Sequence, residues 1–152
     1  MKFISTTLIT AILPLAHAVG NAIVLNNCTE TVYVWSVSSS IDNSQTLENG
    51  ESYTEQFRHD DKTGGITLKV TTAADGIYNN APETDYAYTL DSETVWYDIS
   101  DVNGDAFANY SVALVPANSA CESFIWAGGI PPSGIHTASC NADGDIRLTL
   151  CE

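Results

Sequence analysis

Aspartate side chains gather in a short stretch that has the residue types for acid–base chemistry. Asp98, Asp101 and Asp105 fall within eight residues of one another. Hydrolysis of a glycosidic bond needs two carboxyl groups about 5–9 Å apart, so this grouping is one candidate for such a pair. Aspartates at this spacing more often cap loops and form turns. We favour turns here, and glycoside hydrolysis is the alternative.

A second charged group, His59-Asp60-Asp61, has the side chains of a general acid and base. Gly64 and Gly65 follow closely, which predicts an exposed loop and a solvated cluster of charge. Two stretches, 101–105 and 141–145, are similar to calcium-binding loops but lack the distal glutamate. The four cysteines lack the short spacing of zinc ligands. We therefore expect no metal and no other cofactor.

The first eighteen residues have the features of a secretory signal peptide. Lys2 precedes a mostly apolar run, 4–15, and Ala16-His17-Ala18 is a small-x-small cleavage site. The run is too short and too interrupted to span a bilayer, which takes about 20 residues. We predict a secreted, extracellular protein, with or without association with the cell wall. Residues 19–152 are expected to form a single domain without membrane insertion.

An even number of cysteines in an exported chain predicts two disulfide bonds. Cys28, Cys121, Cys140 and Cys151 allow three pairings. We favour Cys28–Cys151, which would join the two ends of the domain, together with Cys121–Cys140.

Two N-glycosylation sequons begin at Asn27 and Asn109. The first has Cys28 at its middle position, where a disulfide would crowd the site. Asn109 is therefore the better candidate, and a glycoprotein is expected if either sequon is used.

The charge of the chain is strongly negative. The formal net charge is −14, and loss of Lys2 leaves four cationic and 19 acidic residues, so 4 − 19 gives −15 for residues 19–152. Such a surface repels nucleic acids and anionic lipids. It favours solubility, and we expect a monomer whose partner is not a nucleic acid.

Apolar residues recur with the period of two that is typical of strands, and no window has helical periodicity. The stretch 20–38 opens with two apolar runs around Cys28, and Asn49-Gly50 is a signal for a hairpin turn. Further strands are expected at 52–57, 66–71, 86–90, 94–99, 110–115 and 146–150. Many short strands without a helix predict an all-β sandwich of two packed antiparallel sheets.

The core of this sandwich is expected to hold Trp35, Trp96, Phe57, Tyr88 and the alternating aliphatic residues. Trp126 stands beside two glycines and is expected to be exposed.

Four segments resemble the thaumatin-like family. They are Ala22-Ile23-Val24-Leu25-Asn26-Asn27-Cys28 with Thr31-Val32-Tyr33-Val34-Trp35, then Leu47-Glu48-Asn49-Gly50-Glu51-Ser52-Tyr53-Thr54, then Trp96-Tyr97-Asp98-Ile99-Ser100-Asp101-Val102-Asn103-Gly104, and the last strand into Cys151. The short length and few cysteines resemble the compact fungal branch, the yeast-phase-specific or antigenic thaumatin-like proteins. The resemblance implies a thaumatin-like sandwich without accessory domains, and a role at cell walls, in host contact or as an antigen.

The family's acidic cleft is matched only in part. Its first aspartate falls on Asp98, but its second acid falls on Asn103 and its glutamate on Ala87. The family arginine has no clear match, and Lys69 is nearest. We predict a non-enzymatic protein that binds a cell-wall polysaccharide such as β-glucan, or a host surface protein. Asp98, Asp101 and Lys69 are the predicted ligand-binding residues.

Two other functions remain open. One is a weak β-1,3-glucanase or antifungal protein that uses Asp98, so that catalysis is left undecided. The other is a secreted effector that acts on a host protein.

Overall fold

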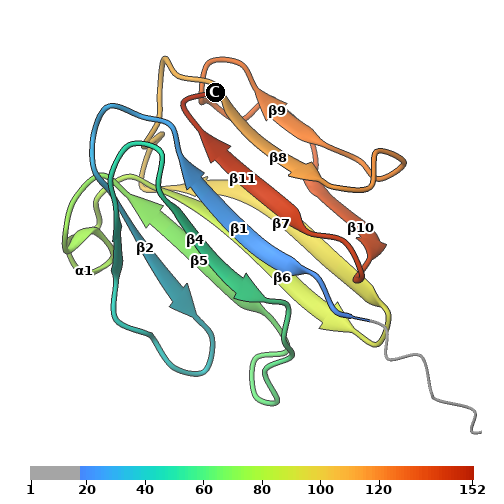
Figure 1. The fold of residues 1–152 in the computed structure, drawn as a ribbon. Coiled ribbons are helices and arrows are strands. Elements are labelled where there is room, and N and C mark those ends of the chain that lie inside the picture. Colours follow the sequence, from blue (N-terminus) through green and yellow to red (C-terminus); the bar gives the residue numbers. More distant parts are fainter. Residues whose placement is uncertain (1–17) are drawn as a thin grey trace, which may run out of the picture.

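The computed structural model describes residues 18–152 as two β-sheets that face each other (Figure 1). The strands are β1 (Asn21–Asn26), β2 (Val32–Val37), β3 (Gln45–Leu47), β4 (Ser52–Gln56), β5 (Ile66–Thr71), β6 (Glu83–Asp91), β7 (Thr94–Val102), β8 (Val112–Pro116), β9 (Phe124–Trp126), β10 (Thr137–Asn141) and β11 (Ile146–Leu150). One short helix, α1 (Gly76–Asn79), lies between β5 and β6. The five-stranded sheet has the order β4-β1-β11-β8-β9, and the six-stranded sheet has the order β10-β7-β6-β5-β2-β3.

The core lies between the two sheets and follows from alternation along the strands. In β11, Ile146, Leu148 and Leu150 are buried, whereas Arg147 between them is exposed. In β6 and β7 the same period buries the predicted core residue Tyr88. Strands with this period place every second side chain on the same face. The predicted all-β sandwich is confirmed.

The two ends of the domain meet in the five-stranded sheet. β1 and β11 lie side by side, blue against red in Figure 1, and they form a parallel pair. The other strand pairs are antiparallel, so the prediction of antiparallel sheets is wrong for this one pair and holds for the rest. Cys28–Cys151 joins these ends across 123 residues of sequence, and Cys121–Cys140 closes a shorter loop across 19. Both predicted disulfides are present.

The turn at Asn49-Gly50 exists, but the hairpin predicted from it is wrong. Gly50 has a positive φ of 82°, and the N–H of Glu51 donates to the carbonyl of Glu48. The strands on either side enter different sheets, because β3 pairs with β2 and β4 pairs with β1. A local turn signal does not report which sheet the chain enters next.

The burial of two tryptophans is the reverse of what the sequence predicts. Trp96 is 50% exposed and therefore outside the core, because its neighbours in β7, Val95 and Tyr97, point inward. Trp126 is only 1% exposed, on the inner face of β9, so the prediction of an exposed side chain is wrong. Trp35 is buried as expected, yet it lies outside the cluster between the sheets.

Other differences concern the loops. Strands β9 and β10 lie between the predicted strands 110–115 and 146–150, where no strand was expected. Strand β7 continues to Val102, beyond the predicted end at residue 99. Helix α1 lies in the stretch 72–84, for which the sequence predicts no element. In residues 18–152 no helix is long and apolar enough to cross a membrane. Of the predicted signal peptide, residues 1–17 lie outside the described part of the chain.

Candidate functional site

A row of small side chains crosses the outer face of the six-stranded sheet. The register pairs Val37 with Thr67, Thr67 with Ala87, Ala87 with Asp98 and Asp98 with Thr137. The row therefore runs straight across β2, β5, β6, β7 and β10. Four interstrand steps of about 4.8 Å make it about 19 Å long.

This row is the floor of a shallow groove. Two hollows of about 120 and 320 Å³ share Ala87, Tyr88 and Thr89, so they adjoin over β6. The remaining lining residues are Trp96, Tyr97, Asp98 and Thr137 at one end and Val37, Ser38, Thr63, Gly65, Ile66 and Thr67 at the other. We call the two hollows together the sheet groove.

One wall of the sheet groove is aromatic. Trp96 lies in the neighbouring row, where it pairs with Thr89 on β6 and Ser139 on β10. Its side chain is half exposed, and it lines the same hollow as Asp98. An exposed indole beside a floor residue as small as Ala87 offers a flat apolar surface to a ligand.

The row on the opposite side of the floor carries an ion-pair cluster. Lys69 on β5 pairs in register with Asp85 on β6. The Nζ atom of Lys69 lies 2.7 Å from Oε1 of Glu83 and 2.9 Å from Oδ2 of Asp85. The side chains of Glu83 and Asp85 are only 6% and 12% exposed. Lys69–Glu83 and Lys69–Asp85 are the two ion pairs found in the described part of the chain.

Burial and charge act against each other in this cluster. Burial lowers the pKa of Lys69, but its bonds to Glu83 and Asp85 outweigh burial and raise it. Burial raises the pKa of Asp85, and the nearby carboxylates of Glu83 and Asp98 add to burial against the opposing effect of Lys69. Both directions agree with one cation shared among several carboxylates.

Asp98 stands on the floor with no cationic partner among residues 18–152. Its Oδ2 atom accepts a hydrogen bond of 2.6 Å from the hydroxyl of Thr137. The residue opposite it on β6 is Ala87, where the family resemblance places a glutamate. A methyl group therefore stands across from the carboxylate that a glycosidase would need as one of a pair.

Asp101 does not join this groove. Asp101 lies an even number of residues from the buried Tyr97 and Ile99, so its side chain is on the inward face of β7, near the end of the strand. Its Oδ1 atom accepts a hydrogen bond of 2.5 Å from the hydroxyl of Thr84. Partial burial raises the pKa of Asp101 to about 6, and the nearby carboxylate of Asp105 contributes. Asp101 and Asp105 thus form a carboxyl pair that is separate from Asp98.

Of the three predicted ligand-binding residues, the fold brings Asp98 and Lys69 to adjacent rows of one face, and it places Asp101 elsewhere. Sequence reasoning did not single out Glu83 and Asp85. Their spacing of two on a strand would have placed both on one face.

The other candidate groups lie on loops. Asp60 accepts hydrogen bonds from the hydroxyls of Ser39 and Thr63 and from the N–H groups of Lys62 and Thr63, which together hold its pKa well below the usual value. These partners match a loop-forming role. His59 instead has its Nδ1 atom 3.2 Å from the carbonyl of Leu90.

The predicted glycosylation sites Asn27 and Asn109 are both exposed, and their use stays a prediction. No cluster of three or more possible metal-binding side chains occurs in residues 18–152.

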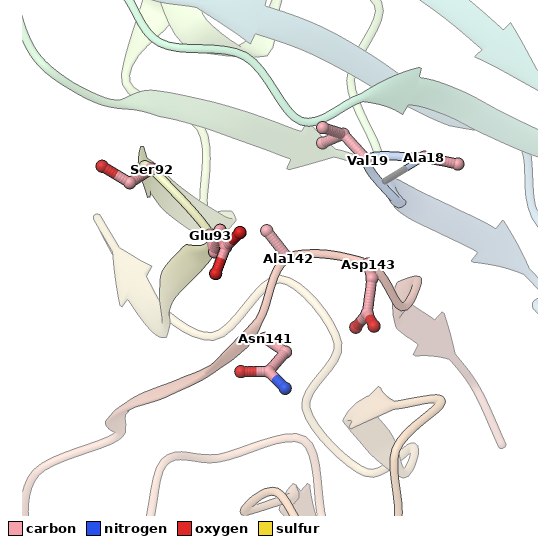
Figure 2. Close-up of a pocket in the computed structure, with 7 residues that line it drawn as sticks. All are labelled: Ala18, Val19, Ser92, Glu93, Asn141, Ala142 and Asp143. Carbon is pink, nitrogen blue, oxygen red and sulfur yellow. The ribbon is translucent and has the colours of Figure 1, made fainter. Parts of the chain in front are cut away.

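A further pocket of about 320 Å³ lies at the start of the described chain (Figure 2). Its lining residues are Ala18, Val19, Ser92, Glu93, Asn141, Ala142 and Asp143. The N–H of Gly20 donates to the carbonyl of Ala142, whose own N–H donates to the carbonyl of Glu93. These bonds fix the entry of the chain into β1 against the β6–β7 turn and the loop after β10.

Comparisons with known proteins agree with the fold. The family described as Blastomyces yeast-phase-specific protein matches residues 9–152. An antigenic thaumatin-like protein from Arthroderma benhamiae is 31% identical over 97% of this chain and 80% of its own length. A secreted thaumatin-like protein, calA, from Emericella nidulans is 27% identical over 97% of this chain and 93% of its own length.

Two solved structures are similar to this one. The crystal structure of the protein elicitor MoHrip2 from Magnaporthe oryzae has a TM-score of 0.72 and 28% identity, covering 88% of this chain and 99% of that one. A thaumatin-like xylanase inhibitor, TLXI, has a TM-score of 0.61 at 13% identity over 86% of this chain and 99% of its own, which shows the shared fold. The protein is secreted, and its chain belongs to the Blastomyces yeast-phase-specific family of thaumatin-like proteins.

Proposed function

We propose that this protein binds cell-wall glycan, without hydrolysing it, through the sheet groove. The observation that carries the proposal is the groove itself: a straight floor about 19 Å long, with an exposed Trp96 and the carboxylate of Asp98 in the same hollow toward one end. The hydroxyl-bearing residues Ser38, Thr63 and Thr67 are among those that line the rest. A flat aromatic surface with a few polar groups that fix orientation is typical of sites for small ligands.

The groove supports binding in preference to catalysis. Asp98 faces Ala87 and therefore lacks a second carboxyl group across the floor. Glu83 and Asp85 are close together, since oxygens of both contact the same Nζ atom, but Lys69 stands between them and their side chains are largely buried. A weak β-1,3-glucanase would need two available carboxyl groups.

The test is retention on insoluble β-glucan, chitin and matrix proteins. We expect the protein to be retained on one of the two polysaccharides, and Trp96→Ala to reduce retention. Ile125→Ala, which removes an exposed apolar side chain from the other sheet, is the matched control and should leave retention unchanged. No retention on either polysaccharide would contradict the proposal, as would equal retention of Trp96→Ala.

A host surface protein is the second candidate partner. One specific finding favours it: MoHrip2, which is 28% identical to this chain, is a protein elicitor. Retention on matrix proteins but on neither polysaccharide would favour this candidate and a role as an effector.

A further inference from the structure

The charges around the sheet groove bear on which glycan it accepts. Resting on the glycan binding proposed above, we propose that the groove selects sugars that carry a primary ammonium group, as in polymers of glucosamine, over neutral β-glucan. The juxtaposition of Trp96 and Asp98 in one hollow carries this inference.

Both of these side chains attract a cation. The face of an exposed indole attracts an ammonium group through its quadrupole, and the attraction is stronger for tryptophan than for other aromatic residues. Asp98 places a partly exposed carboxylate on the adjacent row, and its hydrogen bond from Thr137 occupies one oxygen. A neutral sugar can stack on Trp96, but only a cationic sugar also forms an ion pair with Asp98.

The other end of the groove carries negative charge as well. Thr63 lines the groove there, and its hydroxyl and N–H both donate to Oδ1 of Asp60. Ser39, next to the lining residue Ser38, donates to Oδ2 of Asp60 at 2.7 Å. Asp60 does not itself line the groove, but its carboxylate contacts the lining residue Thr63 in the hollow that does not contain Asp98.

Cationic side chains of the described residues do not line the groove. Lys69 is bound by two carboxylates, Arg58 donates to Ser36, and Arg147 lies on the other sheet. Lys62 belongs to the exposed loop that follows Asp60 and is not a lining residue. Charge complementarity thus favours a cationic ligand, and the chain as a whole carries a formal charge of −14.

The test compares three tetramers by calorimetry with the secreted protein: β-1,4-linked glucosamine, N-acetylglucosamine and β-1,3-linked glucose. Ionic strength near 0.15 M screens attraction between distant charges. We expect the glucosamine tetramer to bind about tenfold more tightly than either neutral tetramer, since it gains both the ion pair and the cation–π contact.

Variants locate the binding. Asp98→Asn should weaken binding of the glucosamine tetramer about threefold to fivefold and leave the neutral tetramers unchanged. Trp96→Ala should weaken binding of every tetramer that binds. Asp143→Asn, an exposed aspartate of the pocket in Figure 2, is the matched control and should behave as the unchanged protein.

The outcomes separate the two proposals. Equal affinity for the three tetramers, sensitive to Trp96→Ala, overturns the selection for ammonium groups and leaves glycan binding in place. If the glucosamine tetramer binds and neither Asp98→Asn nor Trp96→Ala weakens this binding, the sheet groove is not the binding site. If the polyamine spermine binds as tightly as the glucosamine tetramer and depends on Asp98 in the same way, the groove selects positive charge and not a sugar. No binding of any tetramer contradicts both proposals.

Discussion

Replacing Lys69 by methionine should destabilise the protein through the two carboxylates that it leaves behind. Lys69 is the cation bonded to Glu83 and Asp85, whose side chains are 6% and 12% exposed. Removing one partner of a buried ion pair costs about 3–5 kcal/mol, because the remaining charge has neither water nor a partner. Lys69 itself is 24% exposed, so we expect the lower end, about 3 kcal/mol at neutral pH.

The loss should depend on pH in a defined direction. The pKa of Asp85 is already raised by burial, so the folded state holds its proton more readily than the unfolded state does. A carboxyl group of this kind lowers stability as pH rises through the interval between its unfolded and folded pKa values. Without Lys69 this effect grows, and protonation in acid removes it. The difference between variant and unchanged protein should fall below about 1 kcal/mol near pH 4.

Urea unfolding followed by tryptophan fluorescence measures the change. With an m-value of about 2 kcal/mol/M, a loss of about 3 kcal/mol lowers the midpoint by about 1.5 M at pH 7. Lys62→Met removes an exposed cation and should shift stability by less than about 0.5 kcal/mol. The triple variant with Glu83→Gln and Asp85→Asn should recover most of the loss. A loss that is equal at both pH values would refute the reasoning.

Three further predictions concern other parts of the fold. Asp101→Asn should stabilise the protein by about 1 kcal/mol at pH 7 and leave it unchanged near pH 4. The folded pKa of Asp101 is raised to about 6, so its carboxyl group lowers stability as pH rises from the unfolded value through about 6, and the figure is reduced for partial exposure. Urea unfolding at both pH values measures the gain, and an equal effect at the two pH values would contradict it. Removing the disulfide Cys28–Cys151 should lower the free energy of unfolding by about 5 kcal/mol, and removing Cys121–Cys140 should lower it by about 3 kcal/mol, because the loops span 123 and 19 residues. Unfolding experiments under non-reducing conditions measure both losses. A larger loss for the shorter loop would count against the chain-entropy account. Gly129→Ala should lower the free energy of unfolding by more than about 2 kcal/mol, because φ is +65° and the added Cβ would overlap the carbonyl oxygen of Phe107. Gly128→Ala is the control, since its added Cβ meets nothing within 4 Å. Similar melting temperatures for the two variants would disprove this steric argument.

The sequence by itself determined most of the strands, the disulfide-linked ends and the resemblance to the family. Alternation of apolar residues is a local property, so it identified the last strand, which leads into Cys151, and the two strands that pair as β6 and β7. The same alternation could have placed Trp96 outside, because Val95 and Tyr97 on either side of it are buried. The size and hydrophobicity of tryptophan favour the core, but the position of Trp96 in the alternation along the strand decides which face of the sheet its side chain is on.

Only the tertiary structure decided the sheet groove and the partners of Lys69. Residues 37, 67, 87, 98 and 137 form one row because five strands pair in one particular register, and a shift by one residue would turn each side chain to the other face. The sequence at Asn49-Gly50 likewise contains the turn but not the change of sheet that follows it. Register and sheet membership depend on contacts between residues far apart in the chain, and no local pattern specifies these contacts.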